Sequence, residues 1–249
     1  MHDEGESDRV RENLLSWARD AGAPLTERIA AAATAGSRPH EQWYPLAADP
    51  AGPPQLRVTI CKRLPASGAC NRVPLLRGLA TDPAHPVDVR ASAAALLAED
   101  LGEEGRLALH ALSGPDTTDP EAHLAVGAAW GRLDVGSEAE VAYRRVLEDA
   151  QALPRHRVRA AGELTRWRSA RERARQALCS VLSGQGAPVA VRIEAAEKLI
   201  AAHATADAHL GLFRLAVGPE PTREERSRIV ALLPADLGAH AGRNGPSGA

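Results

Sequence analysis

The chain has 249 residues, of which 44% are hydrophobic and 25% are charged, a balance typical of a globular protein with a buried core. Thirty basic and 32 acidic side chains leave a formal net charge of −2, so no overall field attracts the molecule to nucleic acid or an anionic membrane. Aromatic residues make up only 3% and alanine about a fifth, a combination that favours closely packed helices over sheets.

The sequence also predicts a cytoplasmic protein without a metal or cofactor. Its first residues lack the basic and apolar segments of a secretory signal, and no later run has the roughly 18 apolar residues of a membrane helix. The three cysteines, Cys61, Cys70 and Cys179, are odd in number and have no CxxC spacing, which argues against disulfides and against a zinc site. Among the basic residues only Lys62 and Lys198 are lysines, and this bias together with the abundant alanine and glycine indicates a GC-rich bacterial source.

Residues 1–22 are predicted to form an N-terminal cap helix. They contain an amphipathic stretch with Val10, Leu14, Leu15 and Ala18, preceded by acidic residues. A terminal repeat needs a polar outer face to prevent end-to-end stacking, which fits this composition.

A short sequence motif, called the phrase below, then recurs along the chain. It consists of an arginine followed by small or apolar residues at three, four and seven positions after it. These offsets place the residues on one face of a helix. Each copy follows a proline by three to five residues, and proline fits the first turn of a helix. The fourth copy is weaker and has leucine in place of arginine. The seven copies are separated by 29 to 35 residues and begin at Arg28, Arg57, Arg90, Leu124, Arg157, Arg192 and Arg226.

A second apolar helix is predicted between successive copies, with glycine, proline, serine and aspartate marking the turns. One phrase and the following helix form a hairpin of about 34 residues. The predicted fold is therefore all-α, with about seven helical hairpins over residues 23–240 and a disordered tail at residues 241–249. The predicted second helices cover residues 72–80, 104–112, 138–148, 171–182 and 206–217.

The phrase resembles that of HEAT-like repeats, whose bacterial members carry Pro-x-Val-Arg-x-x-Ala-Ala-x-x-Leu. The best copies are Pro86-Val-Asp-Val-Arg90 and Pro188-Val-Ala-Val-Arg192, and the resemblance spans residues 24–233. It implies a right-handed alpha-alpha superhelix, or solenoid, used mainly for binding. It also implies that the repeated arginine belongs to a ladder of hydrogen bonds and salt bridges, with neighbours such as Asp88, and does not bind a ligand.

The fourth copy suggests a rival family. After Leu124, Gly127, Ala128 and Gly131, the segment 139–147 resembles the second helix of a tetratricopeptide repeat, which is also a hairpin of about 34 residues. Tetratricopeptide-like repeats are therefore the alternative assignment.

Local charge gives the candidate binding residues. Residues 155–175 have a net charge of +6, whereas residues 99–121 have a net charge of −6. The basic segment could grip phosphates, or the two segments could neutralise each other or simply be solvated. Trp167 could stack on a base, although its spacing from Ala160 and Leu164 predicts a place on the buried stripe. The candidate partner-binding or phosphate-binding residues are Arg155, Arg159, Arg166, Arg168, Arg171 and Arg175.

No catalytic motif accompanies these features: the sequence has no GxSxG, P-loop, GxGxxG or HExxH, and its nine histidines are scattered. We therefore expect a non-catalytic adaptor, scaffold or regulatory subunit that binds a protein partner on the concave face of the solenoid. Nucleic-acid binding through residues 155–175 is the alternative. A third reading, a HEAT-like DNA glycosylase, fits poorly because such an enzyme uses aromatic side chains on a basic face.

Overall fold

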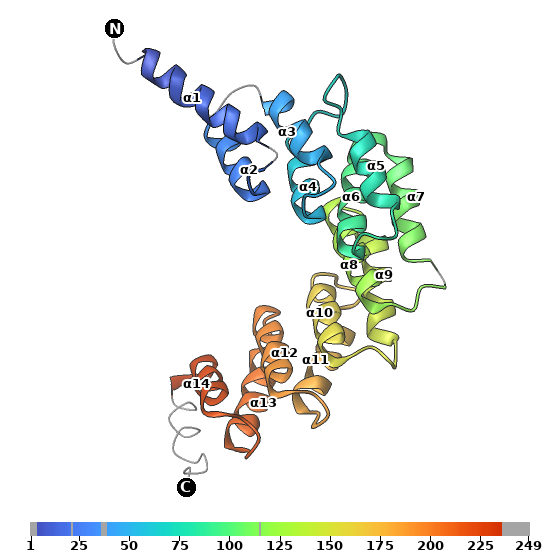
Figure 1. The fold of residues 1–249 in the computed structure, drawn as a ribbon. Helices are drawn as coiled ribbons and strands as arrows, with labels where there is room; N and C mark the ends of the chain where they lie inside the picture. Colours follow the sequence, from blue (N-terminus) through green and yellow to red (C-terminus); the bar gives the residue numbers. More distant parts are fainter. Residues whose placement is uncertain (1–3, 21, 36–38, 115, 236–249) are drawn as a thin grey trace. The chain divides into compact units, whose positions relative to one another are not determined.

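The computed structural model describes residues 4–20, 22–35, 39–114 and 116–235 (Figure 1). These residues form fourteen α-helices and no strand, which confirms the all-α prediction. The predicted tail at residues 241–249 lies outside them. The chain divides into two compact units, Met1–Thr117 and Thr118–Ala249, called unit 1 and unit 2 below.

The described residues of unit 1 form seven helices, and each helix contacts the next along the chain. The predicted cap region forms the first of them, where Ala18 is buried but Val10 and Trp17 are about half exposed. The helices are α1 (Glu4–Arg19), α2 (Leu25–Thr34), α3 (Pro39–Ala48), α4 (Pro54–Cys61), α5 (Val73–Thr81), α6 (Val87–Leu101) and α7 (Glu103–Leu112).

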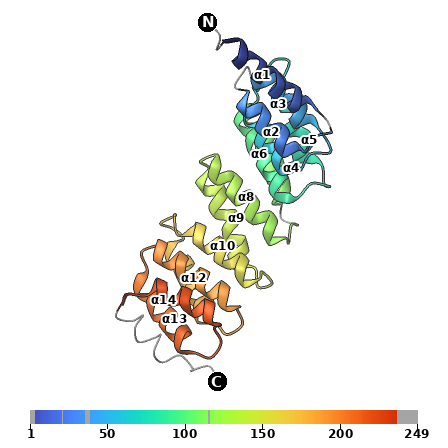
Figure 2. The same cartoon turned by 60° about the vertical axis from the view of Figure 1, so that its left-hand side comes forward.

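Unit 2, over its described residues 118–235, also forms seven helices, which Figures 1 and 2 show from two sides. The helices that carry the repeated phrase, α8, α10, α12 and α14, contact one another in that order, and the intervening helices pack between them. The bounds are α8 (Pro120–Arg132), α9 (Gly136–Glu148), α10 (Pro154–Leu164), α11 (Arg171–Ser183), α12 (Val189–Ala201), α13 (Thr205–Val217) and α14 (Arg223–Leu232).

The spacing of the phrase predicted the helices correctly. All seven copies lie in helices (α2, α4, α6, α8, α10, α12 and α14), and the five predicted second helices coincide with α5, α7, α9, α11 and α13 to within two residues. The paired small residues lie in the core. Ala160 and Ala161, like Ala195 and Ala196, are fully buried, and such small side chains let neighbouring helices approach closely.

The repeated arginine binds the end of the preceding helix. The last four carbonyls of a helix have no partner within it, and they form the negative end of its dipole. In five copies the arginine donates to the carbonyl ten residues earlier, as from Arg57 to Ala47 at 2.9 Å and from Arg192 to Leu182 at 3.0 Å. The others are Arg28 to Ala18, Arg90 to Ala80 and Arg226 to Ala216, while Arg157 donates to Asp149 and Ala150 just after α9.

Two of these arginines also form ion pairs, Arg28 with Asp49 and Arg192 with Glu220, both at 2.8 Å. Asp88, the suggested partner, is exposed and makes no ion pair in the described ranges, so that detail was wrong. The arginine is a structural residue because it satisfies carbonyls that its neighbour helix cannot satisfy itself.

The fourth copy cannot make this bond because the side chain of Leu124 has no donor. Leu124 is 4% exposed and lies in α8, the first helix of unit 2. The departure from the repeat therefore coincides with the start of the second unit.

Replacing Arg192 by methionine tests the structural role. Arg192 is 7% exposed, and its loss leaves the Leu182 carbonyl and Glu220 without their charged donor, so we expect a loss of about 2–3 kcal/mol. Arg228→Met is the control: its pair with Glu197 is half exposed and should contribute less than about 1 kcal/mol. Urea unfolding followed by circular dichroism measures both, and equal losses would contradict the proposed role.

Candidate functional site: a groove on unit 2

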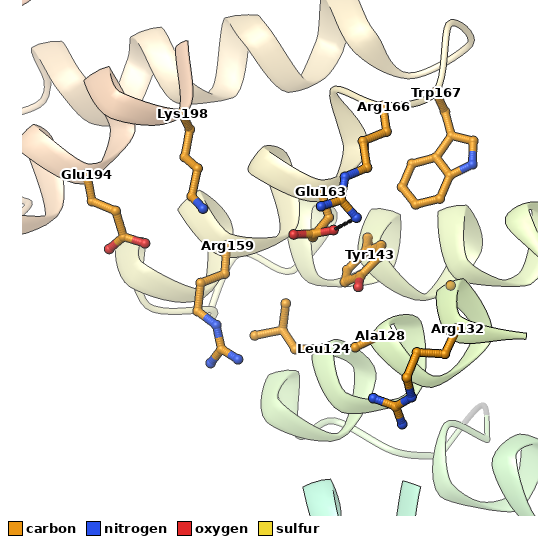
Figure 3. Close-up of a pocket in the computed structure, with 11 residues that line it drawn as sticks. Leu124, Ala128, Arg132, Tyr143, Arg159, Glu163, Arg166, Trp167, Glu194 and Lys198 are labelled. Carbon is orange, nitrogen blue, oxygen red and sulfur yellow. Dashed lines mark ion pairs between the residues drawn. The ribbon is translucent and has the colours of Figure 1, made fainter. Parts of the chain in front are cut away.

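A groove of about 770 Å³ opens on unit 2 (Figure 3). Its lining comes from α8, α9, α10, α12 and the turn after α10, so residues about 70 positions apart in sequence face one space. Small residues form one part of the lining, two aromatic rings another, and charged side chains of both signs the rest.

The weak fourth copy supplies Leu124 and the two small residues of the lining. Leu124, Ala128 and Gly131 all line the groove. At the position of Gly131, other copies have a buried leucine such as Leu164 or Leu199. Gly131 is exposed instead, and a Cβ placed on it would have no atom within 4 Å. The groove therefore lies where the repeat lacks a large side chain.

Two aromatic rings form a second part of the wall. Tyr143 and Trp167 have ring centroids 6.0 Å apart at an interplanar angle of 41°. The Tyr143 ring lies on Gly127, where a Cβ would be only 2.8 Å from ring carbons. Burial raises the pKa of Tyr143 to about 12, and the negative charge of Glu163 adds to the shift.

Trp167 is not part of the buried stripe that the sequence predicted for it. That prediction assumed a helix continuing through residue 167, but α10 ends at Leu164. Trp167 lies in the following turn and is half-buried at the groove.

Four cations and two carboxylates line the groove. Arg159 pairs with Glu121 at 2.9 Å, and Arg166 pairs with Glu163 at 2.6 Å. The other lining charges are Arg132, Glu194 and Lys198.

The six arginines selected from the sequence do not all line this groove. Arg159 and Arg166 line it, whereas the other four do not. Arg175 pairs with Asp207 of α13 at 2.6 Å, and Arg171 donates to the Thr165 carbonyl. Arg155 donates to His156, and Arg168 is exposed.

The expected neutralisation between the two charged segments is only partial. Glu121 does reach Arg159, but Asp100 pairs with Arg72, directly before α5, and Glu104 pairs with Arg77 of α5. The basic segment is neutralised mainly by carboxylates of unit 2, one of them within the segment itself. These are Glu163, Glu148 and Asp207, which pair with Arg166, Arg173 and Arg175.

The remaining reactive side chains and the helix lengths add three observations. No three histidine, cysteine or carboxylate side chains gather to hold a metal ion within the described ranges. Burial raises the pKa of the Cys61 thiol to about 11 and also raises that of Cys179, so both are poor nucleophiles near neutral pH. Among the helices that the structure describes, none is long and apolar enough to cross a membrane.

Comparisons with protein-family models, with curated proteins and with solved structures find no match to this chain. No relative's function can be transferred to it. The functional conclusion therefore depends on the groove and its lining.

Sequence reasoning missed Glu194 and Lys198 as lining residues and assigned no role to Gly131. The available signal was the irregularity of the fourth copy, where Gly131 replaces the usual leucine. Nothing in the sequence showed that α12 would bring Lys198 to the same space.

Two glycines of α8 should respond differently to alanine. Gly127→Ala pushes the Tyr143 ring and should cost about 1–2 kcal/mol, because the ring is packed and 4% exposed. Gly131→Ala meets no neighbour and should be neutral or stabilise by up to about 1 kcal/mol. Urea midpoints measure both changes, and the opposite ranking would show that the Tyr143 ring does not lie on Gly127.

Alkaline pH should reveal the buried phenol. The pKa of Tyr143 is about 12 in the folded protein against an ordinary value of 10.0, so its stabilising effect is complete below pH 10 and is lost as the pH rises towards 12. Tyr143→Phe removes this loss. The difference in melting temperature between the wild type and this variant should therefore be constant below pH 10 and shift against the wild type above it. A difference that does not vary with pH would contradict burial of the hydroxyl.

Proposed function

We propose that the protein is a non-catalytic interaction module, a cytoplasmic adaptor, scaffold or regulatory subunit, that binds a segment of a protein partner in the groove of unit 2. The observation that supports this function is the groove itself: about 770 Å³, with Ala128 and Gly131 leaving room and charged side chains beside them. Small residues let a ligand backbone lie close to the groove, and the charged side chains can bind polar groups of the ligand. A polypeptide fits both, because it carries apolar and charged groups side by side.

A HEAT-like solenoid is the architecture that we propose for this module. The arginine bonds from five copies of the phrase to the carbonyl ten residues earlier support HEAT-like repeats over tetratricopeptide repeats, because the same contact recurs at the same register. On this proposal the hairpins form a right-handed superhelix whose concave face includes the groove.

Nucleic acid fits the groove less well than protein. Its lining includes Glu163 and Glu194, which repel a phosphate backbone, and Arg159 and Arg166 already bind carboxylates. The other candidate arginines lie outside the groove. A polyanion would therefore meet a surface of mixed sign.

A large side chain placed in the groove should weaken ligand binding. Peptides selected from a random phage-displayed library on the full chain should bind Gly131→Trp at least about tenfold more weakly, because the indole occupies open space in the groove. Gly78→Trp is the matched control, since Gly78 is an exposed helical glycine of α5 in unit 1 that also has no atom within 4 Å of an added Cβ.

Isothermal titration of the selected peptides measures both variants. Failure to select any peptide, or equal binding to Gly131→Trp and the wild type, would overturn the proposed function. Salt-sensitive binding of oligothymidylate or oligouridylate that Gly131→Trp leaves unchanged, with no peptide binding, would favour the nucleic-acid alternative.

A further inference from the structure

Lys198 enters the groove across a glycine of the neighbouring helix. A Cβ on Gly162 of α10 would lie 2.9 Å from Cδ of Lys198 and 3.2 Å from its Cγ and Cε, so the lysine stem rests on the glycine backbone. Figure 3 shows the side chain extending from α12 towards Arg159. Gly162 is therefore a positioning residue: any larger side chain at this site would push the lysine stem away.

Lys198 differs from the neighbouring arginines in having no counter-ion. Arg159 and Arg166 each bind a carboxylate, whereas Lys198 makes no ion pair or side-chain hydrogen bond within the residues that the structure describes. It is nevertheless half-buried, because its stem lies against α10. A partly desolvated ammonium gains from an incoming acceptor more than a fully hydrated one does.

The charge of the lining favours an anionic group at this point. The four lining cations exceed the carboxylates Glu163 and Glu194 even when Glu121, which pairs with Arg159, is counted with them. A single carboxylate that enters beside Lys198 would complete an ion pair in a partly enclosed space, which gives specificity as well as attraction.

We propose that the groove recognises its partner segment through an aspartate or glutamate side chain that pairs with Lys198. The proposal rests on the function proposed above and specifies the chemistry of the ligand. The occupant is an acidic segment of another protein, with the acidic residue next to side chains small enough to lie over Ala128 and Gly131.

The surface beyond Lys198 is of mixed sign, which suits a single carboxylate better than a continuous polyanion. A second hollow of about 520 Å³, between α12 and α14, shares Glu194 and Lys198 with the groove and adds Glu197 and Arg228, which pair with each other. A nucleic-acid strand that followed this surface would carry one phosphate per nucleotide past Glu163, Glu194 and Glu197. An isolated carboxylate meets Lys198 without that repulsion.

Charge reversal at Lys198 tests the proposal. The same random peptide library is selected against the full-length wild type and against Lys198→Glu. Wild-type selection should enrich aspartate or glutamate at one position, and selection on Lys198→Glu should enrich lysine or arginine there instead. Lys62→Glu is the matched control: it changes the only other lysine, which is exposed directly after α4 in unit 1, and should leave the enriched sequences unchanged.

Milder variants test the same contact in case Lys198→Glu does not fold. Lys198→Gln should weaken the selected acidic peptide about tenfold, whereas Lys198→Arg should retain most of its affinity. Gly162→Ala should weaken the same peptide severalfold in the wild type and add no further loss in Lys198→Gln, since the alanine acts only through the lysine.

The outcomes separate the two proposals. Peptides that lose binding to Gly131→Trp but show no acidic position, and bind Lys198→Gln as tightly as the wild type, would overturn the lysine–carboxylate contact and leave the groove's function intact. Absence of any groove-dependent peptide would overturn both. Lys198-dependent binding of oligothymidylate that displaces the peptides would overturn the acidic protein segment as the occupant.

Discussion

The bond between an arginine and the carbonyl end of the preceding helix is the interaction on which this fold depends. A helix ends with unsatisfied carbonyls, and short helices have many ends for their length. Here five helices that carry the phrase each supply a guanidinium to the last turn of the helix before them, and Arg157 of α10 supplies one to the turn just after α9. Because donor and acceptor are ten or fewer residues apart, the contact forms locally and sets how each helix meets the next.

This locality explains why the sequence predicts so much of the fold. The phrase repeats at Arg90 and Arg192 because the same contact to the preceding helix recurs. The helix bounds therefore agree closely with those expected from the spacing of the phrase. The prediction failed where the register does not control structure. Trp167 was placed on a continuing helix, but α10 stops at Leu164 and the chain turns.

The groove could not be predicted in the same way because its contacts are distant in sequence. The pair of Arg159 and Glu121 joins residues 38 positions apart, and Lys198 reaches Gly162 from the next hairpin. The net charge of residues 155–175 therefore identified a basic segment, but it did not show which of its arginines form ion pairs. The fourth copy was identified as irregular, yet only the packing shows that Gly131 leaves open space there.

The position of Trp167 gives the protein an optical probe of its own groove. Trp43 and Trp130 are 3% and 2% exposed, so a soluble quencher reaches neither, whereas Trp17 on α1 is half exposed. With Trp17 replaced by phenylalanine, quenchable emission from the described part of the chain comes from Trp167, whose indole lines the groove beside Tyr143. The aromatic scarcity of this sequence thus makes occupancy of one site measurable by fluorescence without any added label.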